Sequence, residues 1–284
     1  MTQGADEIPA LLQHLIQGVR ARHADRPALV GVGGAQGSGK STICRAFAQT
    51  HPRVAHFSLD DVYLTKAERV WRADNISSFS ALRDQDGNFE VRHVARPVTE
   101  QLLLTRGPPG THDLGLAKSL IARLAQNAPT PLPRFDKAAD DRAPDSAWPV
   151  FEGPAEAIVI DGWCMGATPT PQSPPLNELE EDDVEGIWRR ETEMQLAKKY
   201  APFFGAFDAI VYLQAPSWAI VRSWRGQQEE QTLGRALTAA ENKALDRFVM
   251  HYERVTRAML AGHHRAQWIA HLDEERNVVR MEER

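Results

Sequence analysis

The sequence of 284 residues predicts an α/β protein whose mainly parallel sheet carries helices on both faces. Short apolar runs, typical of buried parallel strands, alternate with segments of helical periodicity. A glycine-rich stretch directly follows the first run, and carboxylates follow the next two. Open α/β sheets bind ligands at the carboxyl ends of their strands, so these polar groups predict a binding site.

The predicted elements begin with an amphipathic helix, because apolar residues recur at helical spacing from Ile8 to Val19. A second helix is predicted over 114–124, and a third follows the capping-box pair Thr238 and Glu241, ending near Gly262. The apolar runs expected to form strands are 28–32, 54–59, 157–160, 209–213 and, more weakly, 268–272.

Two long intervals, 62–156 and 164–208, interrupt this alternation, and the first is rich in Pro, Gly, Asp and Arg. Long connections of this kind usually hold lids and substrate loops. We therefore expect a single domain over 1–284 with a helical or loop-rich insertion at about 66–150 that forms the substrate and lid region. The acidic run 178–185 and the pair His263 and His264 are expected at the surface.

Composition excludes several classes of partner. The net charge is −5, with 33 basic and 38 acidic residues spread along the chain, so no basic stripe indicates nucleic-acid binding. No apolar stretch predicts a membrane span or a signal peptide, and two distant cysteines suit a reducing compartment. These features favour a cytoplasmic protein with a small-molecule substrate, and they leave its oligomeric state open.

The glycine-rich stretch matches the phosphate-binding pattern G-x-x-x-x-G-K-[ST] between a strand and a helix. Its glycines allow backbone N–H groups to face phosphate oxygens, Lys40 reaches the β and γ phosphates, and Ser41 ligates Mg²⁺. The alternative is an ordinary glycine-rich turn. The pattern predicts a P-loop NTPase core that binds ATP and Mg²⁺ through Gly34, Ala35, Gln36, Gly37, Ser38, Gly39, Lys40, Ser41 and Thr42.

Acidic residues end the next two strands. Asp60 and Asp61 follow the second, where one carboxylate can orient and deprotonate an attacking hydroxyl and the other can hold Mg²⁺. We assign the base to Asp60 and a supporting catalytic role to Asp61, although both residues could instead cap the next helix. Asp161 follows the third strand and is the second predicted Mg²⁺ ligand, with a simple Asp-Gly turn as the alternative.

Several longer segments resemble the D-glycerate 3-kinases of the plant and fungal type, within the phosphoribulokinase and uridine kinase group. They include GAQGSGKST at 34–42, FSLDDVYLT at 57–65, RGPPGTHD at 106–113, RFDKAADDR at 134–142 and DGWCMGA at 161–167. The resemblance implies transfer of the ATP γ-phosphate to a hydroxyl of a small acid, with Asp60 as base. It also implies that 106–113 and 134–142 form the acceptor site. Asp161 replaces an expected Glu, and the segment 70–103, with Trp71, Phe79, Phe89 and Arg92, is longer than in relatives and could reshape the acceptor pocket.

A carboxylate acceptor needs a cation, and arginine suits it because its planar fork donates two parallel hydrogen bonds. An ordinary surface arginine paired with a nearby Asp is the competing interpretation. The polar stretch 221–230 is expected to carry the lid over the phosphates, with Arg222 and Arg225 as its candidate cations or as members of solvated ion pairs. The candidate acceptor residues are Tyr63, Arg106, His112, Asp113, Arg134, Lys137 and Arg142.

The sequence thus predicts an ATP-dependent kinase whose acceptor is D-glycerate, phosphorylated to 3-phosphoglycerate. The alternatives are a kinase for pantothenate, a nucleoside or a sugar, and a nonenzymatic ATP-dependent switch. A guanine-specific switch is disfavoured because Gln214, Ala215 and Pro216 follow the fourth strand where an Asn-Lys-x-Asp element would be expected.

Overall fold

The computed structural model describes residues 7–77, 80–83, 89–92, 97–171 and 173–284, and a six-stranded sheet is its centre. In spatial order its strands are β12 (Val278–Glu283), β11 (Trp268–Leu272), β10 (Ala209–Gln214), β1 (Ala28–Gly34), β9 (Ala157–Gly162) and β2 (Val54–Ser58). β1 pairs in parallel with β9 and β10, β9 with β2, and β10 with β11, while β12 runs antiparallel to β11. The predicted fold class is confirmed.

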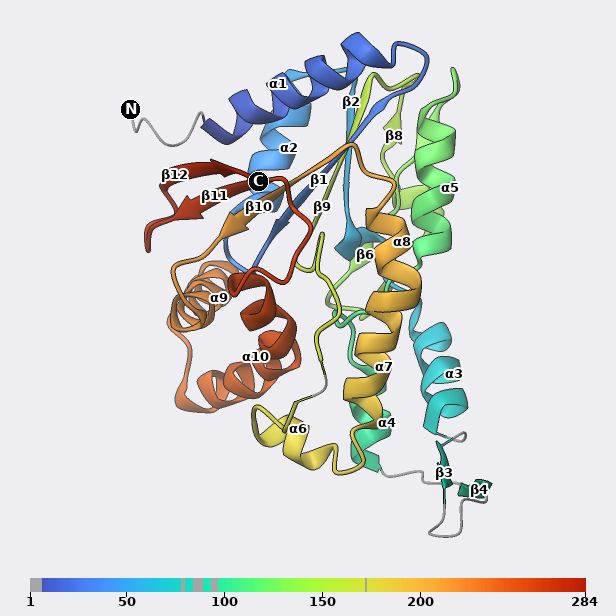
Figure 1. Cartoon of the computed structure of the whole chain (residues 1–284), viewed down its shortest axis with the longest axis vertical. Coiled ribbons are helices and arrows are strands. Elements are labelled where there is room, and N and C mark those ends of the chain that lie inside the picture. The colour runs from blue at the N-terminus through green and yellow to red at the C-terminus, as the bar shows by residue number, and fades with distance from the viewer. Residues whose placement is uncertain (1–6, 78–79, 84–88, 93–96, 172) are drawn as a thin grey trace.

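Helices cover both faces of this sheet (Figure 1). Successive side chains of β1 point to opposite faces, so Val30 and Val32 join one apolar cluster and Leu29 the other. One cluster includes side chains from α1 (Glu7–Arg22), α2 (Lys40–Thr50) and α9 (Trp218–Leu233). The other includes side chains from α5 (Leu114–Leu124), the π-helix η3 (Leu196–Tyr200), α8 (Ala201–Phe204) and α10 (Ala239–Leu260).

A third, smaller apolar cluster lies beyond the sheet, in the lower part of Figure 1. It joins Ala73 of α3 (Lys66–Ser77) to helices α4 (Pro97–Leu104), α6 (Glu178–Asp182) and α7 (Ile187–Gln195). Both long intervals of the chain therefore contribute helices to one packed unit. Short 3₁₀ turns and ladders complete the fold: η1 (Leu59–Val62), η2 (Asp145–Ala147), β3 (Ser80–Arg83) with β4 (Phe89–Arg92), β5 (Thr130–Pro131) with β8 (Val150–Phe151), and β6 (Phe135–Asp136) with β7 (Asp141–Arg142).

The predicted helices agree with the structure, and α1 contains the predicted apolar residues from Ile8 to Val19. α5 spans the predicted residues, and α10 begins with the predicted capping box, in which Thr238 and Glu241 each accept the other's backbone N–H. Among the described residues no helix combines the length and the apolar character that crossing a bilayer requires. The predicted acceptor role of Phe79, Phe89 and Arg92 concerns side chains outside the described part of the chain.

Two surface expectations are wrong. Within the acidic run, Glu180 and Asp183 are fully buried, because Arg254 donates to Glu180 at 2.7 Å and the Trp188 and Arg189 N–H groups donate to Asp183. His263 is exposed, but His264 is buried and stacks near the Tyr212 ring. Polar character alone therefore did not predict the burial of these residues, since their partners lie in other segments of the chain.

Two glycine substitutions test this packing, and we expect them to change the free energy of unfolding in opposite directions. A Cβ at Gly33 would lie 2.6 Å from the Met165 carbonyl oxygen, so Gly33→Ala should lower the free energy of unfolding by about 1–3 kcal/mol. Gly18 is exposed within α1 with open space around it, so Gly18→Ala should raise that free energy by about 0.5–1 kcal/mol. Urea unfolding measures both, and equal midpoints for the two variants would contradict the close approach at Gly33.

Candidate active site

A cavity of about 550 Å³ opens beside the carboxyl ends of β1 and β2. The P-loop and the start of α2 form one wall of it. Asp60, Tyr63, Arg106 and Lys137 form a second wall, and Arg225, Tyr252 and Arg276 approach from later parts of the chain. The structure thus gathers the phosphate motif, the proposed base and several cations around one space.

The P-loop has the backbone conformation that its glycines permit. Gly37 and Gly39 have φ values of 76° and 86°, a left-handed region that other residues rarely adopt. A Cβ at Gly37 would lie 2.6 Å from the Trp224 Cβ, so this position also lacks space for a side chain. The loop leads directly into α2, whose first-turn N–H groups have no partners within the helix.

Unsatisfied polar atoms in this loop fit a polyphosphate. Ser38 Oγ and Gln36 Nε2 are buried and have no hydrogen-bond partner among the described residues. Buried polar groups are normally satisfied, so such atoms indicate that a ligand completes them. The Lys40 ammonium lies 3.4 Å from the Ala35 carbonyl oxygen at the cavity wall. The residues present therefore fit the phosphates of ATP.

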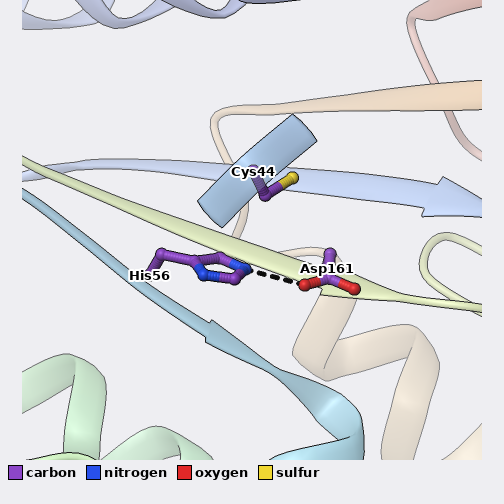
Figure 2. Close-up of side chains that lie close together, drawn as sticks. All are labelled: Cys44, His56 and Asp161. Atoms are coloured by element: carbon purple, nitrogen blue, oxygen red, sulfur yellow. Dashed lines mark hydrogen bonds and ion pairs between the residues drawn. The ribbon is translucent and has the colours of Figure 1, made fainter. Parts of the chain in front are cut away.

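The two proposed Mg²⁺ ligands meet behind the P-loop. Ser41 Oγ donates to Asp161 Oδ2 at 2.6 Å, and the strand register places Ser58 beside Asp161, where its hydroxyl donates to the same oxygen at 3.2 Å. The other oxygen, Oδ1, bonds to His56 Nε2 at 2.7 Å, as Figure 2 shows. A hydroxyl and a carboxylate are hard oxygen ligands, so this pair fits Mg²⁺.

Figure 2 also shows Cys44 of α2 above His56 and Asp161. The ligand atoms of Cys44, His56 and Asp161 lie within 4.8 Å of one another, a spacing that a softer metal could use. However, burial and the nearby Asp161 charge raise the pKa of the Cys44 thiol well above its ordinary value. Its side chain also belongs to the apolar cluster that contains Phe47 of the same helix, and we therefore assign Cys44 to the core.

Asp60 projects into the cavity and is held by two donors. Tyr63 Oη donates to its Oδ1 at 2.7 Å, and Lys137 Nζ donates to its Oδ2 at 2.9 Å. Burial raises the pKa of the Asp60 carboxyl, but the bonds and charge of Lys137, the Tyr63 bond and the Lys40 charge outweigh burial and hold this pKa well below its ordinary value. Asp60 is therefore ionised at neutral pH.

Asp61 has different surroundings and does not line the cavity. Its Oδ2 accepts the Ser58 backbone N–H at 3.0 Å as part of a capping box for η1, and Arg134 donates to the same oxygen at 3.1 Å. Burial raises the pKa of this carboxyl against these two donors. Its contacts match the capping alternative, and Arg134 is used there rather than at the cavity.

The acceptor candidates His112, Arg142 and Asp113 pack behind Tyr63. His112 stacks on the Tyr63 ring at 4.7 Å, its Nδ1 bonds to Tyr200 Oη at 2.6 Å, and burial lowers its pKa to about 4. His112 Nε2 is buried with no partner in the described residues. Arg142 donates to the Tyr63 carbonyl at 2.8 Å and to Asp113 at 3.4 Å, so both support the wall from behind.

Arg106 reaches the cavity itself. Its guanidinium bonds to Asp140 and lies 5.5 Å from the Phe135 ring centroid. The two lid candidates also separate, because Arg225 lines the cavity above Phe248, whereas Arg222 donates to Asp246 and Asn242 of α10. Of all the candidate cations for acceptor and lid, Arg106, Lys137 and Arg225 thus line the cavity.

Sequence reasoning missed several residues of the site. Trp163 Nε1 donates to the Gly107 carbonyl at 2.9 Å and Tyr252 Oη to the Arg106 carbonyl at 3.1 Å, so both anchor the loop that carries Arg106. His56 lies two residues before Ser58, and the two-residue period of a strand places both on one face. This two-residue spacing could have identified His56 from the sequence, whereas no sequence pattern pointed to Arg276.

Comparison with known proteins identifies the family. No protein-family model matches the chain. The uncharacterized kinase mug58 of Schizosaccharomyces pombe is 30% identical over 243 residues, which cover 80% of this chain and 79% of that kinase. The chain belongs to the D-glycerate 3-kinase-type family of P-loop kinases. Like its named relatives, this family member is an ATP-dependent phosphotransferase.

Other relatives agree with this family. The chloroplastic D-glycerate 3-kinase of Arabidopsis thaliana is 26% identical over 245 residues, which cover 80% of this chain and 46% of that protein. The structure of D-glycerate 3-kinase from Cryptococcus neoformans covers 98% of this chain, with a TM-score of 0.70 and 21% identity. The YGR205w protein gives a TM-score of 0.69 at 20% identity. At these identities the two structures establish that this member shares the family's fold.

The surroundings of Asp60 predict a lowered pKa, which NMR titration can measure. In carboxyl ¹³C titrations the pKa of Asp60 should lie below the value of about 3.9 for a free Asp, and Lys137→Met should raise it. Because the pKa is lower in the folded state, ionised Asp60 stabilises the fold above about pH 4, and this contribution is lost as the pH falls further. Lys118→Met, at an exposed lysine of α5, is the control, and an equal shift in both variants would refute the assigned cause.

Proposed function

We propose that this kinase phosphorylates D-glycerate at its 3-hydroxyl. The observation that carries this proposal is the shared cavity, in which Arg106, Lys137 and Asp60 line the same space as the P-loop. A small hydroxy acid has a carboxylate for these cations and a hydroxyl for Asp60. Two relatives named D-glycerate 3-kinase support this choice of acceptor.

In the proposed reaction the P-loop N–H groups and Lys40 hold the triphosphate. Ser41 and Asp161 would hold Mg²⁺, which neutralises charge on the phosphates when it is bound. Asp60 accepts a hydrogen bond from the acceptor hydroxyl and orients its oxygen toward the γ-phosphorus. The new oxygen–phosphorus bond forms as the bond to the β-phosphate oxygen breaks, and the hydroxyl proton passes to Asp60.

A carboxylate with a lowered pKa is a weak base, and the same wall offers a way to strengthen it. Lys137 is exposed and bonds to Asp60 through a flexible side chain. An acceptor carboxylate that draws Lys137 toward itself removes the main attraction that lowers the pKa of Asp60. Substrate binding would thus raise the basicity of Asp60 at the step that needs it.

Arg225 is the cation proposed for the transferring phosphoryl group. It lines the cavity from α9 and is held by Gln228, Glu229 and the Phe248 ring. A cation fixed in this way can stabilise charge on the equatorial phosphoryl oxygens. Arg222 instead supports the packing of α9 on α10 through Asp246.

A neutral acceptor suits this cavity less well. A sugar or a nucleoside would desolvate Arg106 and Lys137 without offering a carboxylate that could replace their present partners, Asp140 and Asp60, which is unfavourable. Pantothenate carries a carboxylate but is larger than glycerate.

An ADP-release assay with Mg-ATP and D-glycerate, pantothenate, uridine and common sugars tests the proposal. We expect turnover with D-glycerate above all others, and Asp60→Asn should reduce kcat by about 10²–10⁴-fold while nucleotide affinity stays within a few-fold. Asp145→Asn, at an exposed aspartate of η2, should leave turnover unchanged. Turnover with a neutral acceptor alone would refute the D-glycerate assignment.

Replacement of single arginines tests the acceptor wall. Arg106→Ala should raise the KM for the acceptor about 10- to 100-fold, because it removes a charged donor worth about 1.5–3 kcal/mol. Arg134→Ala provides the comparison, since Arg134 bonds to Asp61 outside the cavity and should leave that KM within about threefold. Steady-state kinetics at saturating ATP measure both, and equal effects would place Arg106 outside the acceptor site.

A further inference from the structure

The turn between β11 and β12 contains an unusual backbone conformation. Glu274, Glu275 and Arg276 form a three-residue hairpin loop, closed where the Asp273 N–H donates to the Asn277 carbonyl at 2.9 Å. The Arg276 N–H donates back to the Asp273 carbonyl, and Arg276 has a φ of 73°. Glycine is the usual residue at the left-handed position of such a loop, because a side chain there is strained.

The side chain of Arg276 is directed to the nucleotide side of the active site. Its Nε donates to the Gly37 carbonyl oxygen of the P-loop at 2.5 Å, and its Nη2 donates to Gln227 of α9 at 2.8 Å. The guanidinium lies 4.8 Å from the Trp224 ring centroid and lines the cavity. One strained residue therefore connects the hairpin, α9 and the P-loop.

Trp224 of α9 also contacts both the hairpin and the P-loop. Its Nε1 donates to the Glu274 carbonyl at 2.7 Å, and only 1% of the residue is exposed. Its Cβ lies so close to Gly37 that a side chain at Gly37 would clash with it. The Gly37 peptide is thus packed against Trp224 while Arg276 binds its carbonyl oxygen.

We propose that Arg276 is a positioning residue for ATP, which fixes the Gly37 peptide and so the direction of the P-loop N–H groups that follow it. A flip of this peptide would break a charge-assisted hydrogen bond, so the Arg276 contact favours one orientation of the N–H groups of residues 38–41. If the position served only the hairpin, glycine would fit it without strain. Strained residues retained beside a cavity are typical of functional sites. The inference rests on ATP binding at the P-loop and not on the identity of the acceptor.

Arg276→Gly and Arg276→Ala together separate strain from function. Both remove the guanidinium, but only Gly suits the left-handed backbone, so Arg276→Gly should melt about 2–4 °C above Arg276→Ala. Calorimetry with ATP and with ADP should give Kd values raised about tenfold for both variants, matching the loss of one charged hydrogen bond. In kinetics, the KM for ATP should rise more than kcat falls.

Arg280→Ala is the matched control, because Arg280 lies on β12 of the same hairpin and its side chain is 61% exposed. It should leave the Kd for both nucleotides unchanged. A purely structural role for Arg276 predicts that the Gly variant regains the wild-type Kd while the Ala variant remains weak, and that result would overturn the proposal. The calorimetry contains no acceptor, so failure of the D-glycerate assignment would not affect its outcome.

Discussion

The buried carboxylate of Asp161 is the constraint around which this active site is built. It is fully inaccessible to solvent, and an ionised carboxylate in that position is costly unless donors surround it. Ser41 supplies one donor from the start of α2, and Ser58 and His56 supply two from β2. The P-loop helix and two parallel strands are therefore tied to one another beside the P-loop, and the sheet register, which pairs Ser58 with Asp161, makes these contacts possible.

Beyond this polar centre, most cations near the cavity are already paired. Arg134 bonds to Asp61, Arg142 to Asp113, and Arg222 to Asp246. Arg106 and Lys137 are paired as well, with Asp140 and Asp60, but they line the cavity and remain accessible to an acceptor. In the proposed acceptor site, an acceptor carboxylate would therefore exchange with these ionic partners, since both cations are paired within the described part of the chain.

This pairing explains what the sequence could and could not predict. The five parallel strands of the central sheet, the P-loop conformation and the capping box at Thr238 follow from local rules, so they were predicted within a few residues. Which arginine reaches the cavity depends on residues distant in the sequence, as with Arg106, which Asp140 holds. β12 was missed because an edge strand with alternating charge, at Arg280 and Glu282, resembles a solvated segment.

Backbone strain is distributed around the cavity in a consistent way. Gly37 and Gly39 adopt left-handed conformations at no steric cost, whereas Asp140 and Arg276 adopt them with side chains, at φ values of 53° and 73°. Both side chains bond to the walls, since Asp140 holds Arg69 and Arg106, and Arg276 holds Gly37. Because such strain persists only where surrounding packing enforces it, the apolar clusters on both faces of the sheet stabilise the fold and also help to maintain the backbone conformations around the cavity.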